Sequence, residues 1–232
     1  MLTKNINQFR QIVLSLFACL LSLQVSNAQE IPNTLTDVEK NEGFVLLFNG
    51  KTLDGWVGNT QSYIVEEGQI VIYPKGGGGG NLLTSKEYSD FILRFEFKLT
   101  PGANNGLGIR APLGGDVAYK GIELQIIDNT AEQYANLEPY QYHGSLYGVA
   151  PAKRGHLKPV GEWNIQEVIA KGTEIKVILN GTVILDVDYQ EAIEAGTMDH
   201  KEHPGLLRDS GRIGFLGHGD VVSFRNIRIK EL

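Results

Sequence analysis

A strict alternation of residues from Phe91 to Leu99 commits this part of the chain to a β-sheet. Every second position is apolar, namely Phe91, Leu93, Phe95, Phe97 and Leu99. A repeat of two residues is typical of a strand with one buried face. In total about a dozen short strands are predicted, with turn pairs such as Asn180-Gly181 between them, and only residues 189–195 could form a short helix. The sequence therefore predicts an all-β sandwich or barrel.

Residues 1–28 have the composition of an export signal. Lys4 and Arg10 form a basic start, residues 12–23 are an apolar run, and residues 26–28 are a small-residue cleavage site. The apolar run is too short for a good transmembrane helix, and no other segment is long enough to cross a bilayer. We therefore expect a protein exported to the periplasm or the extracellular medium.

The remainder of the chain is acidic and has no cysteine. Cys19 is the only cysteine, so removal of the signal leaves no disulfide or thiol chemistry. Its surroundings weakly resemble a lipoprotein cleavage site, but Phe17 fits that pattern poorly, so lipid anchoring is the less favoured outcome. Loss of Lys4 and Arg10 moves the formal net charge from −6 to −8. This charge argues against nucleic acid and anionic lipid as partners.

The domain organisation follows from length and composition. Residues 29–42 are polar and are predicted to be a linker, and residues 43–232 are long enough for a single all-β domain. Two long irregular loops are expected at 129–162 and 196–211. The first is rich in tyrosine and histidine, which favours a functional loop over a disordered one. The five glycines at 76–80 are predicted to be a hairpin loop, because no helix with a phosphate-binding Lys follows them.

The strand predicted from Gly121 to Asp128 carries polar residues on one face. Glu123 and Gln125 alternate with apolar residues. Regular alternation places Asp128 on the face opposite Glu123, and a bulge at Ile126-Ile127 would bring it back. The alternative is a solvated face that ends in an Asx turn at Asp128.

The preceding strand, residues 106–111, adds a second polar group. If the two strands pair, Arg110 lies on the same face as Glu123. Gly106 and Gly108 share that face and would let another group approach the backbone. The alternative for Arg110 and Glu123 is a surface ion pair worth less than about 1 kcal/mol.

Histidines offer three further candidate sites. His143 lies in the first long loop together with Tyr147, and His218 lies between two glycines at the end of a strand, where it would be exposed. His200 and His203 have a spacing that could bind a metal, but a third ligand is absent nearby in the sequence. No Gly-x-Ser-x-Gly elbow is present, which argues against a hydrolase triad.

Seven segments, in order, resemble the 3-keto-disaccharide hydrolase domain family. They are LFNGKTLDGW (47–56), NNGLGIR (104–110), GIELQIID (121–128), GSLYG (144–148), GEWN (161–164), LNG (179–181) and GRIGFLGHG (211–219), the last followed by FRNI (224–227). The resemblance covers roughly residues 43–232. It implies a concanavalin A-like jelly-roll sandwich of two antiparallel sheets, and a secreted enzyme that acts on a carbohydrate or glycoside substrate.

The resemblance also implies cleavage of glycosides whose sugar is oxidised at C3. A 3-keto group acidifies the C2 proton, so that a base can remove it and the aglycone can leave from C1 by β-elimination. Water then adds to the product, and the net reaction is hydrolysis. Such a site needs a base, an electrophile for the enolate oxygen and an acid for the leaving group.

The candidate residues can be assigned to these roles as hypotheses. Glu123 or His143 takes the C2 proton. Arg110 or a bound divalent cation stabilises the enolate, and Asp128 or His218 protonates the leaving oxygen. The residues predicted to hold the sugar are Asn105, Gln125, Tyr147 and Trp163. The two aromatic side chains among them would stack on the sugar ring.

Two other functions are compatible with the same fold. Laminarinase-type glucanases carry Glu-x-Asp-x-x-Glu on a bulged strand, and this chain has Glu123, Gln125 and Asp128 at that spacing. Because Gln125 replaces a carboxylate, an ordinary double-displacement glycosidase is disfavoured. A non-catalytic carbohydrate-binding module is the other alternative, and it would not need Arg110, Glu123, Asp128 and His218 to converge.

Overall fold

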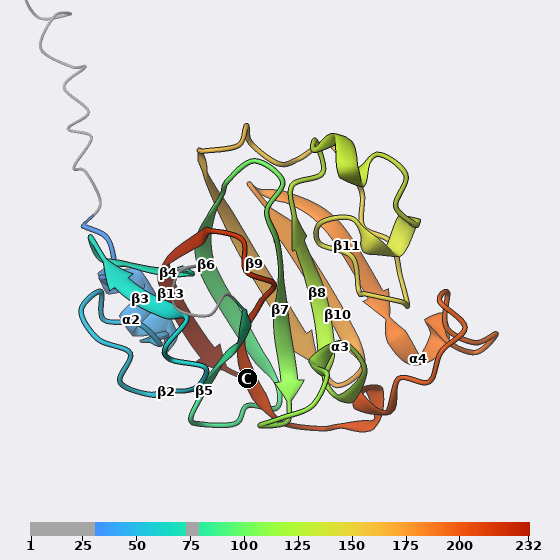
Figure 1. Cartoon of the computed structure of the whole chain (residues 1–232). Coiled ribbons are helices and arrows are strands. Elements are labelled where there is room, and N and C mark those ends of the chain that lie inside the picture. Colours follow the sequence, from blue (N-terminus) through green and yellow to red (C-terminus); the bar gives the residue numbers. More distant parts are fainter. Residues whose placement is uncertain (1–30, 73–78) are drawn as a thin grey trace, which may run out of the picture. The chain divides into compact units, whose positions relative to one another are not determined.

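The structure, a computed structural model, describes residues 31–72 and 79–232. Its strands form two antiparallel sheets, which confirms the predicted β-sandwich (Figure 1). The predicted export signal with Cys19 and most of the glycine run at 76–80 lie outside the described residues. Within the described ranges, no helix has both the length and the apolar character needed to cross a membrane.

The larger sheet has eight strands. Seven follow the order β11-β10-β9-β6-β13-β4-β3, and β1 pairs with β13. Their bounds are β1 Val45–Leu46, β3 Tyr63–Glu66, β4 Gln69–Ile72, β6 Phe91–Leu99, β9 Trp163–Lys171, β10 Glu174–Leu179, β11 Thr182–Asp188 and β13 Val222–Glu231. Asn180 and Gly181, both with positive φ, join β10 to β11 and confirm the predicted two-residue turn.

The smaller sheet has five strands in the order β2-β5-β12-β7-β8. They are β2 Trp56–Gly58, β5 Gly80–Thr84, β7 Asn104–Ala111, β8 Ile122–Ile127 and β12 Arg212–Gly217. The helices are short: α2 Asp37–Glu42, α3 Val117–Lys120, α4 Tyr189–Ala192, and the 3-10 helices η2 Glu132–Tyr134, η3 Pro139–Gln141 and η4 Pro204–Leu207. Helix α4 lies within the segment that the sequence predicts to be helical.

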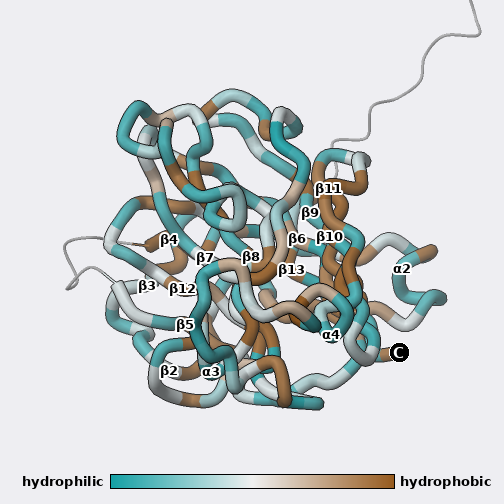
Figure 2. Tube along the Cα trace, turned by 90° about the vertical axis from the view of Figure 1, so that its right-hand side faces the viewer, coloured by the Kyte–Doolittle hydropathy of each residue, from teal (hydrophilic) through white to brown (hydrophobic). Residues whose placement is uncertain are grey.

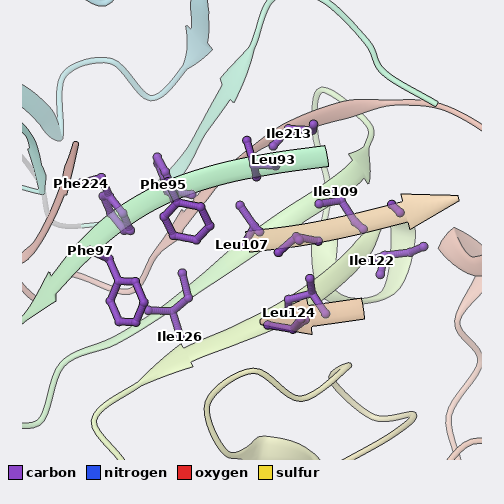
Figure 3. Packing of buried hydrophobic residues seen from close by; sticks show 14 of the residues in the cluster. Leu93, Phe95, Phe97, Leu107, Ile109, Ile122, Leu124, Ile126, Ile213 and Phe224 are labelled. Carbon is purple, nitrogen blue, oxygen red and sulfur yellow. The ribbon is translucent and has the colours of Figure 1, made fainter. Parts of the chain in front are cut away.

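The core is one layer of apolar side chains between the sheets. The five alternating residues of β6 are at most 3% exposed, and Figure 3 shows that Phe95 and Phe97 face Leu107 of β7 and Ile126 of β8. Phe215 of β12 stacks on Phe224 of β13 with ring centroids 3.6 Å apart. Hydrophobic residues concentrate in the strands, and the connecting loops are mostly hydrophilic (Figure 2). The alternation in the sequence therefore decides which face of each sheet points inward.

Helix α2 lies within residues 29–42, which the sequence predicts to be a linker. Thr36 caps the helix in a capping box with Glu39. The Glu39 side chain is 9% exposed, bonds to the Arg228 guanidinium of β13 and lies 3.7 Å from an Arg94 nitrogen of β6. These ion pairs attach the helix to the larger sheet. The domain boundary at residue 43 stays a prediction.

We expect Glu39→Gln to lower the free energy of unfolding by about 1–3 kcal/mol, because it removes one partner of largely buried guanidinium groups. Glu42→Gln on the same helix is the matched control. Its carboxyl is half exposed and 3.9 Å from Arg94, so the expected loss is below about 0.5 kcal/mol. Urea denaturation of both variants measures the difference, and equal losses would contradict the anchoring role of Glu39.

Candidate active site

A cavity of about 430 Å³ lies against the outer face of the smaller sheet. Its floor is formed by β5, β7, β8 and β12, and its walls by α3 and by the long loop that follows β8. The polar side chains that line it are Asn81, Asn104, Asp116, Tyr119, Glu123, Gln125, Tyr134, Gln141, Tyr147 and His218. This concave, polar cavity is the candidate active site.

Strand β8 places its polar residues in the cavity by simple alternation. Glu123, Gln125 and Ile127 line the cavity, while the residues between them belong to the core. The loop after β8 covers the outer edge of the strand, since Tyr147 N–H donates to the Glu123 carbonyl at 3.0 Å and Gly144 N–H donates to the Gln125 carbonyl at 2.8 Å. These backbone bonds bring the Tyr147 side chain to the cavity wall.

Glycines in β7 make room for the Glu123 carboxyl. A Cβ added at Gly106 would lie 2.0 Å from Glu123 Oε1, so any larger residue there would displace the carboxyl. At Gly108, an added Cβ would lie 2.8 Å from a Val117 methyl. The predicted close approach to these two glycines is confirmed. The group near Gly106 is the Glu123 carboxyl, and the group near Gly108 is the Val117 side chain of α3.

The Glu123 carboxyl is in an unusual electrostatic environment. The residue is 7% exposed, and no described residue donates a hydrogen bond to its carboxyl. Burial, followed by the negative charge of Asp116, raises the pKa of Glu123 to about 8. A carboxyl with a pKa near neutrality can both accept and return a proton.

Other polar atoms at the cavity are available to a ligand. Gln125 Oε1 accepts a hydrogen bond from the Ile126 N–H at 3.1 Å, which leaves the Gln125 amide nitrogen without an acceptor among the described residues. Asn104 Oδ1 is buried and likewise lacks a donor in the described part of the chain. The Tyr147 hydroxyl accepts from the Gln141 amide at 3.3 Å. The cavity thus presents amide and phenol groups, which suit hydroxyl and carbonyl oxygens.

Of the nine predicted site residues, the cavity brings together Glu123, Gln125, Tyr147 and His218. His218 is exposed at the end of β12, as the flanking glycines led us to expect. The catalytic and binding roles of these four residues stay predictions. The other five residues lie elsewhere.

Arg110 does not share a face with Glu123, contrary to prediction. Two residues of β7, Ile109 and Arg110, lie opposite Ile213 alone, and Arg110 has a φ of +48°. This bulge turns the Arg110 side chain away from the cavity. Its guanidinium is 3% exposed, donates to the Tyr189 hydroxyl at 3.0 Å and lies 3.3 Å from an Asp90 oxygen. Arg110 is therefore a structural residue.

Asp128 also differs from the prediction, because the expected bulge at Ile126-Ile127 is absent. The pairing of β8 with β7 is regular from Ile122 to Ile127. Asp128 lies beyond the strand end, where Oδ1 accepts from the Thr130 N–H and hydroxyl and Oδ2 accepts from the Gly102 N–H. The alternative of an Asx turn is thus the correct one.

His143 lies in the core and does not line the cavity. Its ring stacks on Phe97 at 5.0 Å between centroids, and Nε2 lies 3.1 Å from Gln166 Oε1. Complete burial lowers the pKa of His143 to about 4, with the Gln166 bond opposing that shift. A base buried in this way cannot reach the substrate, so Glu123 is left as the candidate for proton abstraction.

Asn105 and Trp163 are not placed to hold a sugar in the cavity. Asn105 is fully buried on the core face of β7, and alternation presents its neighbour Asn104 to the cavity instead. Trp163 lies in β9 of the other sheet, where the cationic groups of Lys98 and Arg225 are 4.9 and 4.0 Å from its ring centroid. Both predictions were wrong because the sequence shows the type of a residue but not the direction in which its side chain points.

Several lining residues, above all Asp116 and Tyr119, were not predicted from the sequence. Asp116 is the N-cap of α3 and Tyr119 lies within it. This helix was not predicted because it has only four residues. Asp116 followed by a short segment ahead of β8 is a capping pattern that could have indicated it. The side chains that contact Tyr119 come from a distant loop and leave no local signal.

The described residues do not form a site that would by itself hold the divalent cation considered above. No group of three or more His, Cys, Asp or Glu side chains is placed together in the described part of the chain. His203 instead pairs with Asp199, with Nε2 3.1 Å from a carboxylate oxygen.

Comparison with known proteins identifies relatives of known type. The family described as the 3-keto-alpha-glucoside-1,2-lyase-like domain matches residues 43–230. A 3-keto-disaccharide hydrolase of Bacteroides thetaiotaomicron is 29% identical, covering 82% of this chain and 79% of that protein. A Parabacteroides distasonis structure, provisionally classed as a glycosyl hydrolase, has a TM-score of 0.75 at 29% identity and covers 87% of this chain and 100% of that one.

More distant structures share the fold alone. A Bacillus subtilis protein of unknown function with a galectin-like fold has a TM-score of 0.51 at 11% identity, covering 77% of this chain and 90% of that one. Galectin-like folds are β-sandwiches, which agrees with the two antiparallel sheets described above.

We expect Glu123→Gln to be more stable than the wild type, by a margin that grows with pH. The pKa of Glu123 is about 8 in the folded protein and 4.5 in the unfolded reference. The stability of the wild type relative to this variant is therefore highest below pH 4.5 and falls as the pH rises toward 8, because only the unfolded state ionises in that range. The gap should reach a few kcal/mol. Urea denaturation from pH 4.5 to 8 measures it, with the exposed Glu162→Gln as control, and a gap independent of pH would contradict the assignment.

Proposed function

This chain belongs to the 3-keto-alpha-glucoside-1,2-lyase-like domain family, and we propose that it is a carbohydrate-active enzyme that hydrolyses 3-keto-glycosides. The proposal is carried by one observation. The Glu123 carboxyl lies on the cavity floor, lacks a hydrogen-bond donor among the described residues and has a pKa near 8. The relatives named above are a 3-keto-disaccharide hydrolase and a protein classed with glycosyl hydrolases, which supports the substrate class.

Glu123 would move the proton at C2. Ionised Glu123 takes the proton from C2, which the neighbouring ketone acidifies, and an enolate forms. The electron pair then expels the aglycone oxygen from C1 and leaves a C1–C2 double bond conjugated with the ketone. Water adds its oxygen to C1, and Glu123 returns a proton to C2. A carboxyl with a pKa near neutrality suits both proton transfers.

Gln125 would take the role that was assigned to Arg110. The enolate oxygen needs a hydrogen-bond donor that is in place before the charge develops. Gln125 lines the cavity, and its amide nitrogen is unused by the described residues because the amide oxygen is held by the Ile126 N–H. Asn104 and Tyr147 line the cavity and would contact the sugar hydroxyls. Of the two residues predicted to protonate the leaving oxygen, only His218 lies at the cavity.

The predicted signal at residues 1–28 supports export as part of this proposal. Polymeric and glycosylated substrates are outside the cell in that setting, and an exported enzyme meets them directly. The absence of cysteine after residue 28 means that folding in an oxidising compartment would need no disulfide.

A non-catalytic binding module keeps some support from the structure. Arg110 and Asp128 do not converge with Glu123, and convergence was the feature expected of a catalytic site. A binding site, however, gains nothing from a buried carboxyl that lacks a hydrogen bond, because burial of such a group is costly. That cost is understandable where the carboxyl has to transfer a proton.

An ordinary glycosidase is the other alternative, and Asp116 gives it a specific basis. Glu123 and Asp116 both line the cavity, and two carboxyl groups across a sugar are what such enzymes need. Asp116 is already used as the cap of α3, since its side chain accepts from the Ala118 N–H at 3.1 Å. Activity on unoxidised glycans would support this alternative.

We expect wild-type protein to cleave a 3-keto-disaccharide and to release no reducing sugar from an unmodified β-glucan. Glu123→Gln should lower kcat on the 3-keto substrate by about 10²–10⁴-fold, because the amide cannot take the C2 proton. Glu162→Gln is the control and should keep full activity. Parallel assays with a chelator test whether a cation takes part. Unchanged turnover in folded Glu123→Gln would remove Glu123 from the mechanism.

We expect Gly106→Ala to lower kcat by about 10²-fold while the protein stays folded. An added methyl group would overlap Glu123 Oε1 and push the carboxyl from its position, and a displacement of about 1 Å is enough for such a loss. Circular dichroism checks folding, and the same 3-keto-disaccharide assay measures kcat. Wild-type kcat in this variant would show that the observed carboxyl position is not needed.

A further inference from the structure

Among the described tyrosines that line the cavity, Tyr119 is the one whose hydroxyl accepts a hydrogen bond from a cationic side chain. Tyr119 lines the cavity from α3, and its oxygen accepts a hydrogen bond from Lys201 Nζ at 2.8 Å. That bond occupies a lone pair of the phenol and leaves the phenol proton free. No described residue accepts this proton, so it is available to a ligand in the cavity.

A buried His–Asp pair holds Tyr119 and Lys201 in place. The His203 ring packs on the Tyr119 ring with centroids 4.8 Å apart. The side chains of His203 and Asp199 are at most 4% exposed and lie 3.1 Å apart, and an Asp199 oxygen also accepts from the Lys201 backbone N–H at 3.1 Å. Gly148 makes room for this pair, because an added Cβ would lie 2.6 Å from His203 Nε2.

His218, the residue predicted for the same role, is not held in this way. It is exposed between two glycines, and no described side chain bonds to its ring. A proton donor acts best when its position is fixed before the reaction. Tyr119 meets this requirement and His218 does not.

We propose that Tyr119 is the general acid that protonates the leaving oxygen, and that Lys201 is a positioning residue that stabilises the phenolate formed in that step. The inference rests on the proposed function. It assigns Tyr119, which faces the same cavity as Glu123, to the opposite proton transfer.

The two proton transfers balance over the whole reaction. In the elimination, the C2 proton goes to Glu123, the bond between C1 and the glycosidic oxygen breaks, and the Tyr119 proton goes to that oxygen. In the hydration, a water proton goes to the Tyr119 phenolate, the water oxygen bonds to C1, and Glu123 returns its proton to C2. Both residues end in their starting state, and no oxidant or reductant is consumed.

Leaving-group dependence tests the inference, because only a poor leaving group needs the acid. We expect Tyr119→Phe to lower kcat/KM by about 10²-fold or more on a 3-keto-disaccharide, whose leaving group is a hydroxyl oxygen of the second sugar. On 4-nitrophenyl 3-keto-glucoside, whose leaving group departs as a stable anion, the loss should be less than about 3-fold. A structural role alone would lower both rates equally, and equal losses would overturn the proposal.

Lys201 gives an independent variant if Tyr119→Phe does not fold, since Lys201 is on the surface. Lys201→Met should lower kcat/KM on the disaccharide by about 10-fold and spare the nitrophenyl substrate, and Lys201→Arg should restore part of the loss. Lys171→Met, an exposed lysine in the other sheet, is the control and should leave both rates unchanged.

The remaining outcomes separate this inference from the proposed function. If His218→Asn shows the leaving-group pattern and Tyr119→Phe does not, His218 is the acid and the inference is wrong while the proposed function stands. If wild-type protein turns over neither 3-keto substrate, the proposed function fails and the inference fails with it. Selective loss in Tyr119→Phe alone supports both.

Discussion

Strand β8 is buried on both faces, and the functional part of the structure depends on how each face is covered. All six residues from Ile122 to Ile127 are buried. One face packs into the core, where dispersion and the hydrophobic effect hold the two sheets together. The other face is covered by the loop after β8 and by α3. That second cover turns an ordinary edge strand into the floor of an enclosed site, and it removes water from Glu123.

The removal of water explains the chemistry that the cavity can perform. A carboxylate in water is a weak base, whereas a desolvated one that lacks hydrogen bonds holds its proton more strongly. Glu123 is kept in this state by the glycines of β7, which leave space for the carboxyl but offer it no donor. Across the cavity wall, Tyr119 is held by a lysine and a buried His–Asp pair. The two sides of the site therefore differ in electrostatic character, as acid–base catalysis requires.

Departures from regular strand geometry decide which polar residues reach this site. The bulge in β7 gives Arg110 a positive φ and turns it toward Tyr189 and Asp90. The absence of a bulge in β8 leaves Asp128 in an Asx turn. A bulge adds one residue to a strand and reverses the facing direction of the residues beyond it. Its position depends on the partner strand, so a single strand read alone does not reveal it.

The sequence by itself determined the all-β class, the strand positions, the Asn-Gly turn and the placing of Glu123 and Gln125 on one face, because these follow from local periodicity and turn chemistry. The choice of a two-sheet sandwich over a barrel came from the family resemblance. It also determined the family, through ordered segments that span the domain. Tertiary structure alone decided that His143, Asn105 and Trp163 lie away from the cavity and that Tyr119 lies in it. Those outcomes depend on contacts between segments far apart in the chain, such as α3 with the loop that carries Lys201, and no local pattern encodes such contacts.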